Sequence, residues 1–139
     1  MDTKYHYGYW RPVTAIREAA TDGNPRTTAD PTWTPLVTTP PVPDYDSAHA
    51  VEGAAAAAVL ARVLGNRVSF ATCSLTLPAG GCESPTRVLR EFDSFSQAAA
   101  ENGVSHIYVG FHFRDAVDAG MNHGDRIGTA AVKNFMLPI

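Results

Sequence analysis

The sequence predicts an all-α fold in which several helices pack as one bundle. Three observations point this way. Apolar residues recur at helical spacing near the N-terminus, an alanine-rich stretch follows a helix-capping residue, and Gly120, Gly124 and Gly128 repeat every four residues near the end. Because 139 residues suffice for one hydrophobic core, residues 1–139 are predicted to be a single domain.

The first 45 residues predict one helix and one long loop. Apolar side chains are spaced for a helix over residues 3–20, and Pro12 would kink this helix or begin a new one inside it. Residues 21–45 are crowded with Pro, Gly, Asp and Thr, which favours an ordered loop with tight turns.

The clearest helix spans residues 47–64. Asp46 or Ser47 can cap its first turn, and Gly65 followed by Asn66 is typical of a helix end. Its alanine-rich face suits close packing against another helix.

The C-terminal third predicts further helices. After a short helical turn near residues 85–89, a helix is expected from Asp93 or Ser94 to Gly103. A final helix of about 20 residues follows, with its glycines spaced for tight helix contact. No pair of strands is predicted.

Charge and hydropathy argue against two classes of partner. The formal net charge is −3 and the cations form no basic stripe, so neither nucleic acid nor an anionic membrane is an expected partner. The longest apolar run, residues 53–65, is dominated by alanine and contains Arg62, so no membrane span is expected. No apolar segment follows Met1, so no signal peptide is predicted in this chain.

The two cysteines lie close together in a loop-like stretch. Pro78, Gly80 and Gly81 separate Cys73 from Cys82, which favours a local disulfide over a metal site with only two thiols. A disulfide would indicate an oxidising compartment, so the protein is expected to be secreted or periplasmic. The alternative is a pair of reduced, inert thiols.

Two groups of residues suit an oxyanion. Lys4 and Arg11 are seven residues apart, so on a helix both cations would project from nearly the same face. Ser47 and Ala48 begin the alanine-rich helix, where free backbone N–H groups and the helix dipole favour anions. His49 would lie beside such an anion.

A third group contains Ser105, His106 and His112. His112 follows Ser105 by seven residues, so the two could face the same point. Taken singly, such residues are more often solvated surface or locally hydrogen-bonded histidines. The histidines also offer an alternative, because His49, His106 and His112 could present three imidazoles to zinc.

In this order and spacing, the groups match a known pattern. The stretches "KYHYGYWRP", "PDYDSAHA" and "SHIYVGFHFRDA" resemble the three-part signature K-x6-R-P, P-S-G-H and S-R-x5-H-x3-D. That signature belongs to the vanadium-dependent haloperoxidases and the type 2 phosphatidic acid phosphatases of the acid phosphatase superfamily. The intervening chain resembles secreted bacterial haloperoxidase-like members, so the resemblance covers nearly all residues. The resemblance implies that this chain corresponds to the C-terminal half of their helical bundle.

The resemblance implies a role for each matching residue. Lys4 and Arg11 would neutralise the equatorial oxygens of vanadate or phosphate, and Ser47 Oγ and the Ala48 N–H would hydrogen-bond to them. His49 would be the general acid or base. His112 would be the vanadium ligand of a peroxidase, or the nucleophile that forms a phospho-histidine in a phosphatase.

The sequence departs from the signature at four positions. Asp46 replaces proline and is expected to repel an anion, while Ala48 replaces glycine. His106 replaces an arginine that would bind the anion, so a permanent charge becomes one present only below the histidine pKa. Ala116 stands where the final acid is expected, which leaves Asp115 or Asp118 to orient His112.

Three functions remain open. The first is a haloperoxidase that oxidises halide with hydrogen peroxide at a histidine-ligated vanadate. The second is a phosphatase acting on phosphate monoesters through phospho-histidine, and the third is a catalytically decayed helical scaffold or binding module. The rings of Tyr5, Tyr7, Tyr9 and Trp10 are expected to need a partner, either a second copy of the chain or a missing N-terminal half. The alternative is an ordinary core stripe.

Overall fold

The structure is a computed structural model that describes residues 2–74, 82 and 87–136. The predicted all-α class is confirmed, because helices dominate the described residues and one short two-stranded sheet accompanies them. In chain order the elements are α1 (Asp2–Tyr7), α2 (Pro12–Arg17), the 3₁₀ turn η1 (Ala19–Thr21), α3 (Ala48–Leu64), β1 (Phe70–Cys73), β2 (Leu89–Phe92), α4 (Phe95–Tyr108) and α5 (Arg114–Phe135).

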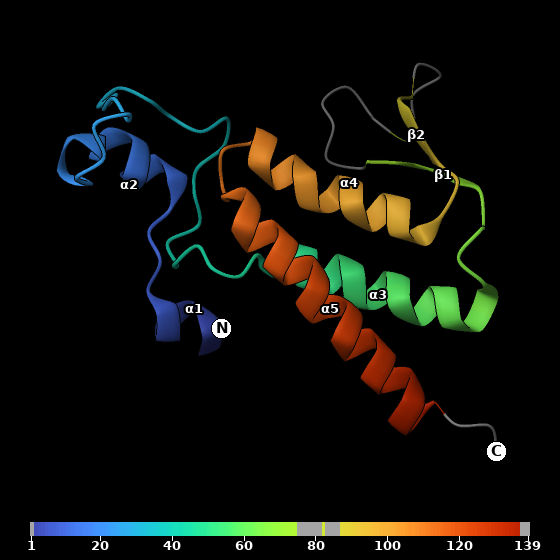
Figure 1. The fold of residues 1–139 in the computed structure, drawn as a ribbon. Coiled ribbons are helices and arrows are strands. Elements are labelled where there is room, and N and C mark those ends of the chain that lie inside the picture. The colour runs from blue at the N-terminus through green and yellow to red at the C-terminus, as the bar shows by residue number, and fades with distance from the viewer. Residues whose placement is uncertain (1, 75–81, 83–86, 137–139) are drawn as a thin grey trace.

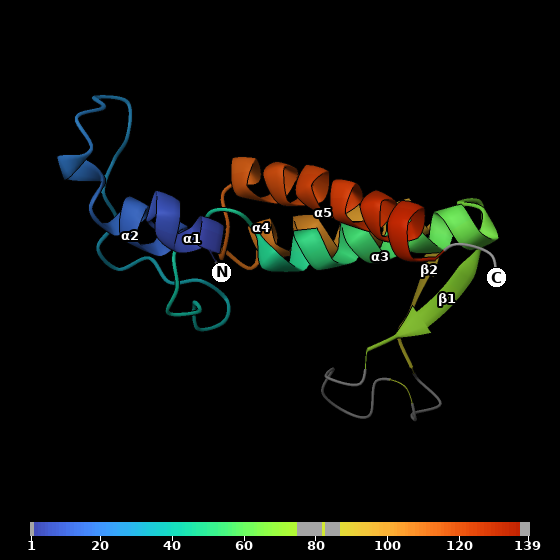
Figure 2. The same ribbon diagram turned by 90° about the horizontal axis from the view of Figure 1, so that it is seen from below.

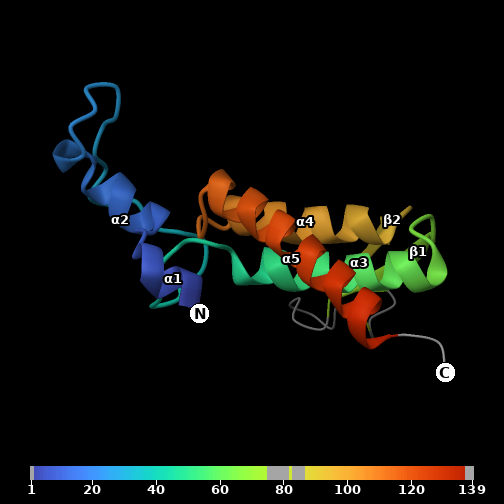
Figure 3. The ribbon, with the colours of Figure 1, turned by 60° about the horizontal axis from the view of Figure 1, so that its bottom comes forward.

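The three long helices form the body of the molecule. Figures 1 and 3 show α5 crossing α3, with α4 beside both, and each pair of these helices is in contact. The buried residues at this junction are small, namely Ala50, Ala54 and Ala57 of α3 and the three glycines of α5. None of the helices in the described residues is long and apolar enough to cross a membrane.

Glycine lets α5 approach the α3 backbone closely. A Cβ atom at Gly120 would lie 2.6 Å from the Ser47 carbonyl oxygen, and one at Gly124 would lie 2.8 Å from Ala54 Cβ. Side chains at these positions would force the helices apart. The prediction that the glycine repeat marks tight helix contact is therefore confirmed, and this contact brings the start of α5 against the start of α3.

The predicted single helix over residues 3–20 is wrong, because two short helices occupy this stretch. Gly8 has a φ of 56°, a left-handed conformation that ends α1, and Pro12 then occupies the first turn of α2. The alternative that Pro12 starts a new helix is therefore the one observed.

The predicted long loop is present and ordered between η1 and α3. It is joined to α2 by the hydrogen bond from the Asp30 N–H to the Ile16 carbonyl, 3.0 Å, and to the end of α4 by that from the Leu36 N–H to the Val109 carbonyl, also 3.0 Å. Its last residues return to the start of α3. Figure 2 shows α1, α2 and this loop at one end of the long helices and the strands at the other.

The absence of strands is the second wrong prediction. Strands β1 and β2 pair antiparallel, with Phe70 opposite Phe92 and Cys73 opposite Leu89. The Phe70 and Phe92 rings are 5.3 Å apart, and a disulfide joins Cys73 to Cys82. Neither four-residue strand carries a strong period of its own, so the ring packing and strand pairing decide the conformation.

Two predicted boundaries also change. A helical turn was expected near residues 85–89. Residues 85 and 86 lie outside the described residues, and residues 87–89 form no helical turn, because Leu89 begins β2. Helix α4 starts after Ser94, as predicted, but continues past Gly103 to Tyr108. Gly103 faces Val117 of α5, so it permits a close contact inside the helix.

Candidate functional site

The residues of the three sequence groups lie near one another where the start of α3 meets the connection between α4 and α5. Arg11 Nη1 lies 3.2 Å from His112 Nε2, and the rings of His49 and His106 are 4.5 Å apart. Ser105 of the third group is excluded, because its hydroxyl donates to the Asn102 carbonyl at 2.7 Å within α4. Together with Asp44, the other predicted residues form the candidate site, which consists of Lys4, Arg11, Asp44, Ser47, Ala48, His49, His106 and His112.

Lys4 of α1 holds the segment that precedes α3. Its buried ammonium group donates hydrogen bonds to the carbonyl oxygens of Pro43, Asp44 and Asp46, at 3.1, 2.9 and 2.6 Å. Burial and the nearby Arg11 lower the Lys4 pKa, against the opposing effect of the neighbouring aspartates. Because an ammonium has three N–H donors, these three carbonyls engage all of them.

Arg11 joins the first sequence group to the third. Its Nε donates to the Val42 carbonyl at 2.8 Å, and its Nη1 donates to the Phe111 carbonyl at 3.0 Å. Nη1 is also 3.4 Å from His112 Nδ1 and 3.2 Å from Nε2, so it is within hydrogen-bond distance of both ring nitrogens. Within the described residues, Nη2 is the guanidinium nitrogen that has no hydrogen-bond acceptor.

The acid beside His112 is Asp44, not Asp115 or Asp118. His112 Nδ1 lies 2.6 Å from Asp44 Oδ1, and both side chains are buried, whereas Asp115 and Asp118 are exposed. The contact is short but not aligned as a hydrogen bond, and Asp44 Oδ1 has no hydrogen-bond partner in the described part of the chain. Arg11 Nη1, 3.7 Å from this oxygen, supplies positive charge.

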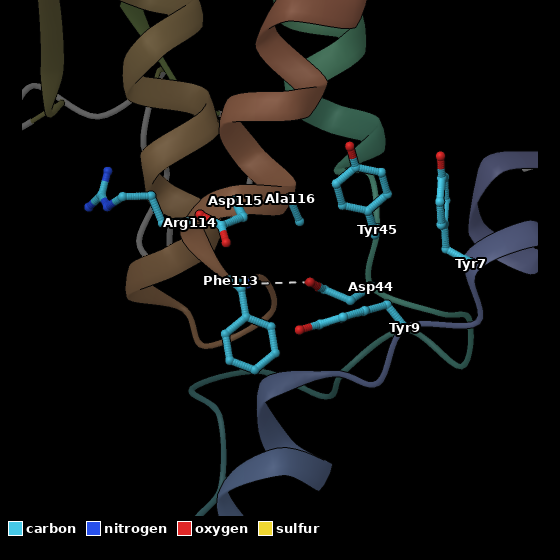
Figure 4. Close-up of a pocket in the computed structure, with 8 residues that line it drawn as sticks. All are labelled: Tyr7, Tyr9, Asp44, Tyr45, Phe113, Arg114, Asp115 and Ala116. Carbon is cyan, nitrogen blue, oxygen red and sulfur yellow. Dashed lines mark hydrogen bonds between the residues drawn. The ribbon is translucent and has the colours of Figure 1, made fainter. Parts of the chain in front are cut away.

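Asp44 is the functional candidate that the sequence groups did not include. Its position carried one signal, because it is the first charged residue after Asp30 and lies just before the helix that starts at Ala48. The Phe113 N–H donates to its second oxygen, Oδ2, at 3.5 Å, as the dashed line in Figure 4 shows. Asp44 thus connects the loop before α3 to the start of α5.

The His106 ring lies near both of the other imidazoles. Its centroid is 4.5 Å from that of His49 and 5.7 Å from that of His112, with interplanar angles of 33° and 32°. The described residues contain no group of three or more His, Cys, Asp or Glu side chains that could hold a metal ion. The structure therefore does not support the zinc alternative.

His106 is uncharged near neutral pH. Burial, followed by the influence of His49, His112 and Arg11, lowers its pKa to about 4. Its Nδ1 is buried and has no hydrogen-bond partner among the described residues. The residue that stands in place of an arginine therefore supplies a polar atom here, and no permanent charge.

Ser47 caps α3. Its hydroxyl accepts from the Ala50 N–H at 3.5 Å, and its own N–H donates to the Ala116 carbonyl of α5 at 2.9 Å. Ser47 is fully buried, while Ala48 is half-buried and His49 is exposed. The helix start therefore lies between the buried and the accessible part of the candidate site.

The carboxylate of Asp46 is bound by residues outside the candidate site. Thr3 Oγ1 donates to Oδ1 at 3.0 Å, and His123 Nδ1 lies 2.8 Å from Oδ2. Burial raises the pKa of Asp46, but the hydrogen bonds from His123 and Thr3 outweigh this effect and hold it below its ordinary value. The charge expected to repel an anion is thus engaged by α1 and α5, and His123 is a second residue that the sequence groups missed.

An aromatic cavity of about 530 Å³ adjoins Asp44. Its lining includes the rings of Tyr7, Tyr9, Tyr45 and Phe113, which surround the Asp44 carboxylate in Figure 4. Tyr7 is 60% exposed and Tyr9 is 52% exposed, so these rings do not form the core stripe that was the alternative to an exposed surface.

Comparisons with known proteins relate the chain to vanadium enzymes. The family model described as the VCPO second helical-bundle domain matches residues 1–139. A bacterial vanadium-dependent iodoperoxidase structure is 35% identical with a TM-score of 0.75, over 95% of this chain and 28% of that chain. Holo and apo structures of a bacterial vanadium-dependent chloroperoxidase, 19% identical with TM-scores of 0.72, share the fold over 94% of this chain and 31% of theirs. No curated protein shows a significant match.

Proposed function

Because the chain belongs to the family of the VCPO second helical-bundle domain, we propose that it provides the vanadate-binding site of a vanadium-dependent haloperoxidase. The enzyme would oxidise halide with hydrogen peroxide. The observation that carries the proposal is the buried His112, which has the Asp44 carboxylate 2.6 Å from Nδ1 and Arg11 Nη1 3.2 Å from Nε2. A carboxylate at one imidazole nitrogen orients the ring and favours the tautomer whose other nitrogen can act as a ligand.

The residues of the candidate site fit an oxyanion in three respects. Arg11 Nη2 has no acceptor in the described residues, and His106 Nδ1 is a buried polar atom without a partner among them. The first backbone N–H groups of α3 have no acceptor within the helix, as at any helix start. Lys4 differs, because three carbonyls already engage its ammonium group. It would act on an anion through its charge, or after exchanging one of these bonds.

The chemistry would be divided among few residues. When bound, vanadate supplies Lewis-acid activation of peroxide towards halide. His112 would hold it through Nε2. Arg11 Nη1, 3.2 Å from this nitrogen, would turn towards the anion, and Arg11 and Ser47 would hydrogen-bond to its oxygens. His49, exposed and next to His106, would accept and return a proton at its imidazole. Peroxide and halide would be the small-molecule substrates.

Orthovanadate titration by calorimetry near neutral pH tests the proposal. We expect micromolar affinity for the wild-type chain, loss of binding in His112→Ala, and unchanged binding in His6→Ala, which removes a histidine outside the candidate site. Peroxide with bromide or iodide is then the activity assay. Wild-type affinity that persists in His112→Ala would contradict the proposal. Hydrolysis of a phosphate monoester without vanadate, inhibited when vanadate is added, would instead favour the phosphatase.

A catalytically decayed scaffold is the second candidate. Two observations favour it, namely the full engagement of Lys4 by carbonyls and the uncharged state of His106 near neutral pH. Under this alternative the wild type gives no heat with orthovanadate. Binding that returns when Asp46→Pro, Ala48→Gly and His106→Arg are combined would assign the loss to these substitutions. Oxidation of bromide or iodide by peroxide with the vanadate-loaded wild type would exclude this alternative.

A further inference from the structure

Thr3, Asp46 and His123 form a polar cluster beside the candidate site. The Asp46 carboxylate is the centre of this cluster, with Thr3 Oγ1 at 3.0 Å from one oxygen and His123 Nδ1 at 2.8 Å from the other. The Asp46 side chain is 9% exposed and that of His123 is 38% exposed. The cluster therefore has a buried anion whose histidine partner reaches the surface.

The cluster holds the chain segment just before α3, which carries Ser47 of the candidate site. The Asp46 carbonyl accepts the 2.6 Å hydrogen bond from Lys4, and the next N–H, that of Ser47, donates to Ala116 of α5. Ala116 and His123 are seven residues apart, two turns along one face of α5. One face of α5 thus holds this segment at two points, the Ser47 N–H and the Asp46 carboxylate.

We propose that His123 is a positioning residue for the candidate site, acting through Asp46. By binding the Asp46 carboxylate, His123 keeps this negative charge on the side of α1 and α5. It also holds Ser47 in place, together with the Asp46 carbonyl that accepts a hydrogen bond from Lys4. The inference rests on the proposed function, because an oxyanion must bind for the position of Ser47 to matter.

The physical reason is the cost of a buried carboxylate that lacks a partner. Without His123, Thr3 is the side chain still bonded to Asp46 in the described residues, and a buried charge so poorly compensated is strongly unfavourable. Lys4 is the nearby cation that Asp46 already influences. A carboxylate turning towards Lys4 would neutralise charge needed by the anion and would displace the segment that carries Ser47.

The test is a double-mutant cycle on orthovanadate affinity. We expect His123→Ala to weaken binding about tenfold, the effect of one lost hydrogen bond to a charged group. In an Asp46→Pro background, or Asp46→Asn if the proline variant does not fold, His123→Ala should have little further effect. His123→Gln retains an N–H donor and should recover part of the affinity, and His6→Ala is the matched control.

Hydrogen exchange at the Ser47 amide supplies a readout that needs no vanadate. We expect faster exchange in His123→Ala than in the wild type or His6→Ala. An affinity unchanged by His123→Ala, or an equal loss in the Asp46→Pro background, would overturn the positioning role. If the wild type binds no vanadate, the proposed function fails. The positioning role of His123 is then tested by Ser47 exchange alone, and an exchange rate unchanged in His123→Ala would overturn it.

Discussion

His106 lies near two other imidazole rings and the Arg11 guanidinium, and this position decides its charge. Burial and, after it, His49, His112 and Arg11 lower the His106 pKa to about 4. The sequence alone indicates that a titratable group replaces a permanent cation, but the direction and size of the shift depend on neighbours from three segments. At the residue scale, charge state follows from tertiary contacts.

The lowered His106 pKa predicts that the vanadate-free protein loses stability in acid. The folded protein disfavours the charged ring, so the unfolded chain binds more protons between its ordinary value of 6.5 and about 4. The stabilising effect of neutral His106 is therefore complete above pH 6.5 and is lost as the pH falls towards 4.

Urea unfolding at pH 7.5 and pH 5 would measure this loss, and His106→Gln should reduce the difference between the two conditions. Asp46 contributes in a lower pH range. Because its pKa is held below the ordinary value of 3.8, its charged form stabilises the folded protein above pH 3.8, and this stabilisation is lost as the pH falls below that value. The same pH dependence in His106→Gln and wild type would assign the loss to other groups.

Helices α3 and α5 approach closely because glycine and alanine face each other across their contact. The sequence indicated this contact through the four-residue glycine repeat, a local pattern that a reader can recognise without the fold. The antiparallel hairpin formed by β1 and β2 had no such local pattern. Four-residue strands are specified mainly by pairing, so β1 and β2 could not be predicted from either segment alone.

Gly124→Ala should destabilise the protein by about 1–3 kcal/mol, the usual range for overpacking a close contact. The added methyl group would meet the Val51 carbonyl oxygen and Ala54 Cβ, and backbone atoms cannot move aside easily. Urea unfolding measures the change.

Gly53→Ala is the matched control for Gly124→Ala. Its closest neighbour, at 3.0 Å, is the Asn102 side-chain nitrogen, which donates to the His49 carbonyl at 2.9 Å; a small shift of one side chain would relieve this contact, and alanine favours the helix. We expect this variant to be near neutral. Equal destabilisation by both variants would mean that the backbone contact with α3 is not the cause.

The molecule has two separate ends. The candidate site lies with α1, α2 and the long loop, and the disulfide-linked hairpin lies at the other end of the long helices (Figure 2). Tyr5, Tyr7 and Tyr9 are exposed at the first end. That these rings need a partner, either a second copy or a preceding half, stays a prediction, as does an oxidising compartment.

Combining Cys73→Ser with Cys82→Ser should lower the free energy of unfolding by about 2–3 kcal/mol, as expected for a short closed loop. Because the hairpin lies away from the candidate site, orthovanadate affinity and the NMR signals of His112 should not change. Urea unfolding and NMR of the double variant test both statements. A shifted His112 signal would show that the two ends are coupled.

The sequence by itself determined the helical class, the start of α3 next to a cap at Asp46 or Ser47, the glycine contact and, through the resemblance, most residues of the candidate site. The first three depend on spacing within one segment, so local physical rules suffice for them, whereas the site residues were recognised from the order of three segments. Tertiary structure alone decided that Asp44 faces His112 and that Asp46 binds His123. These pairs are 68 and 77 residues apart, and the path of the long loop and the packing of α5 on α3 bring them together.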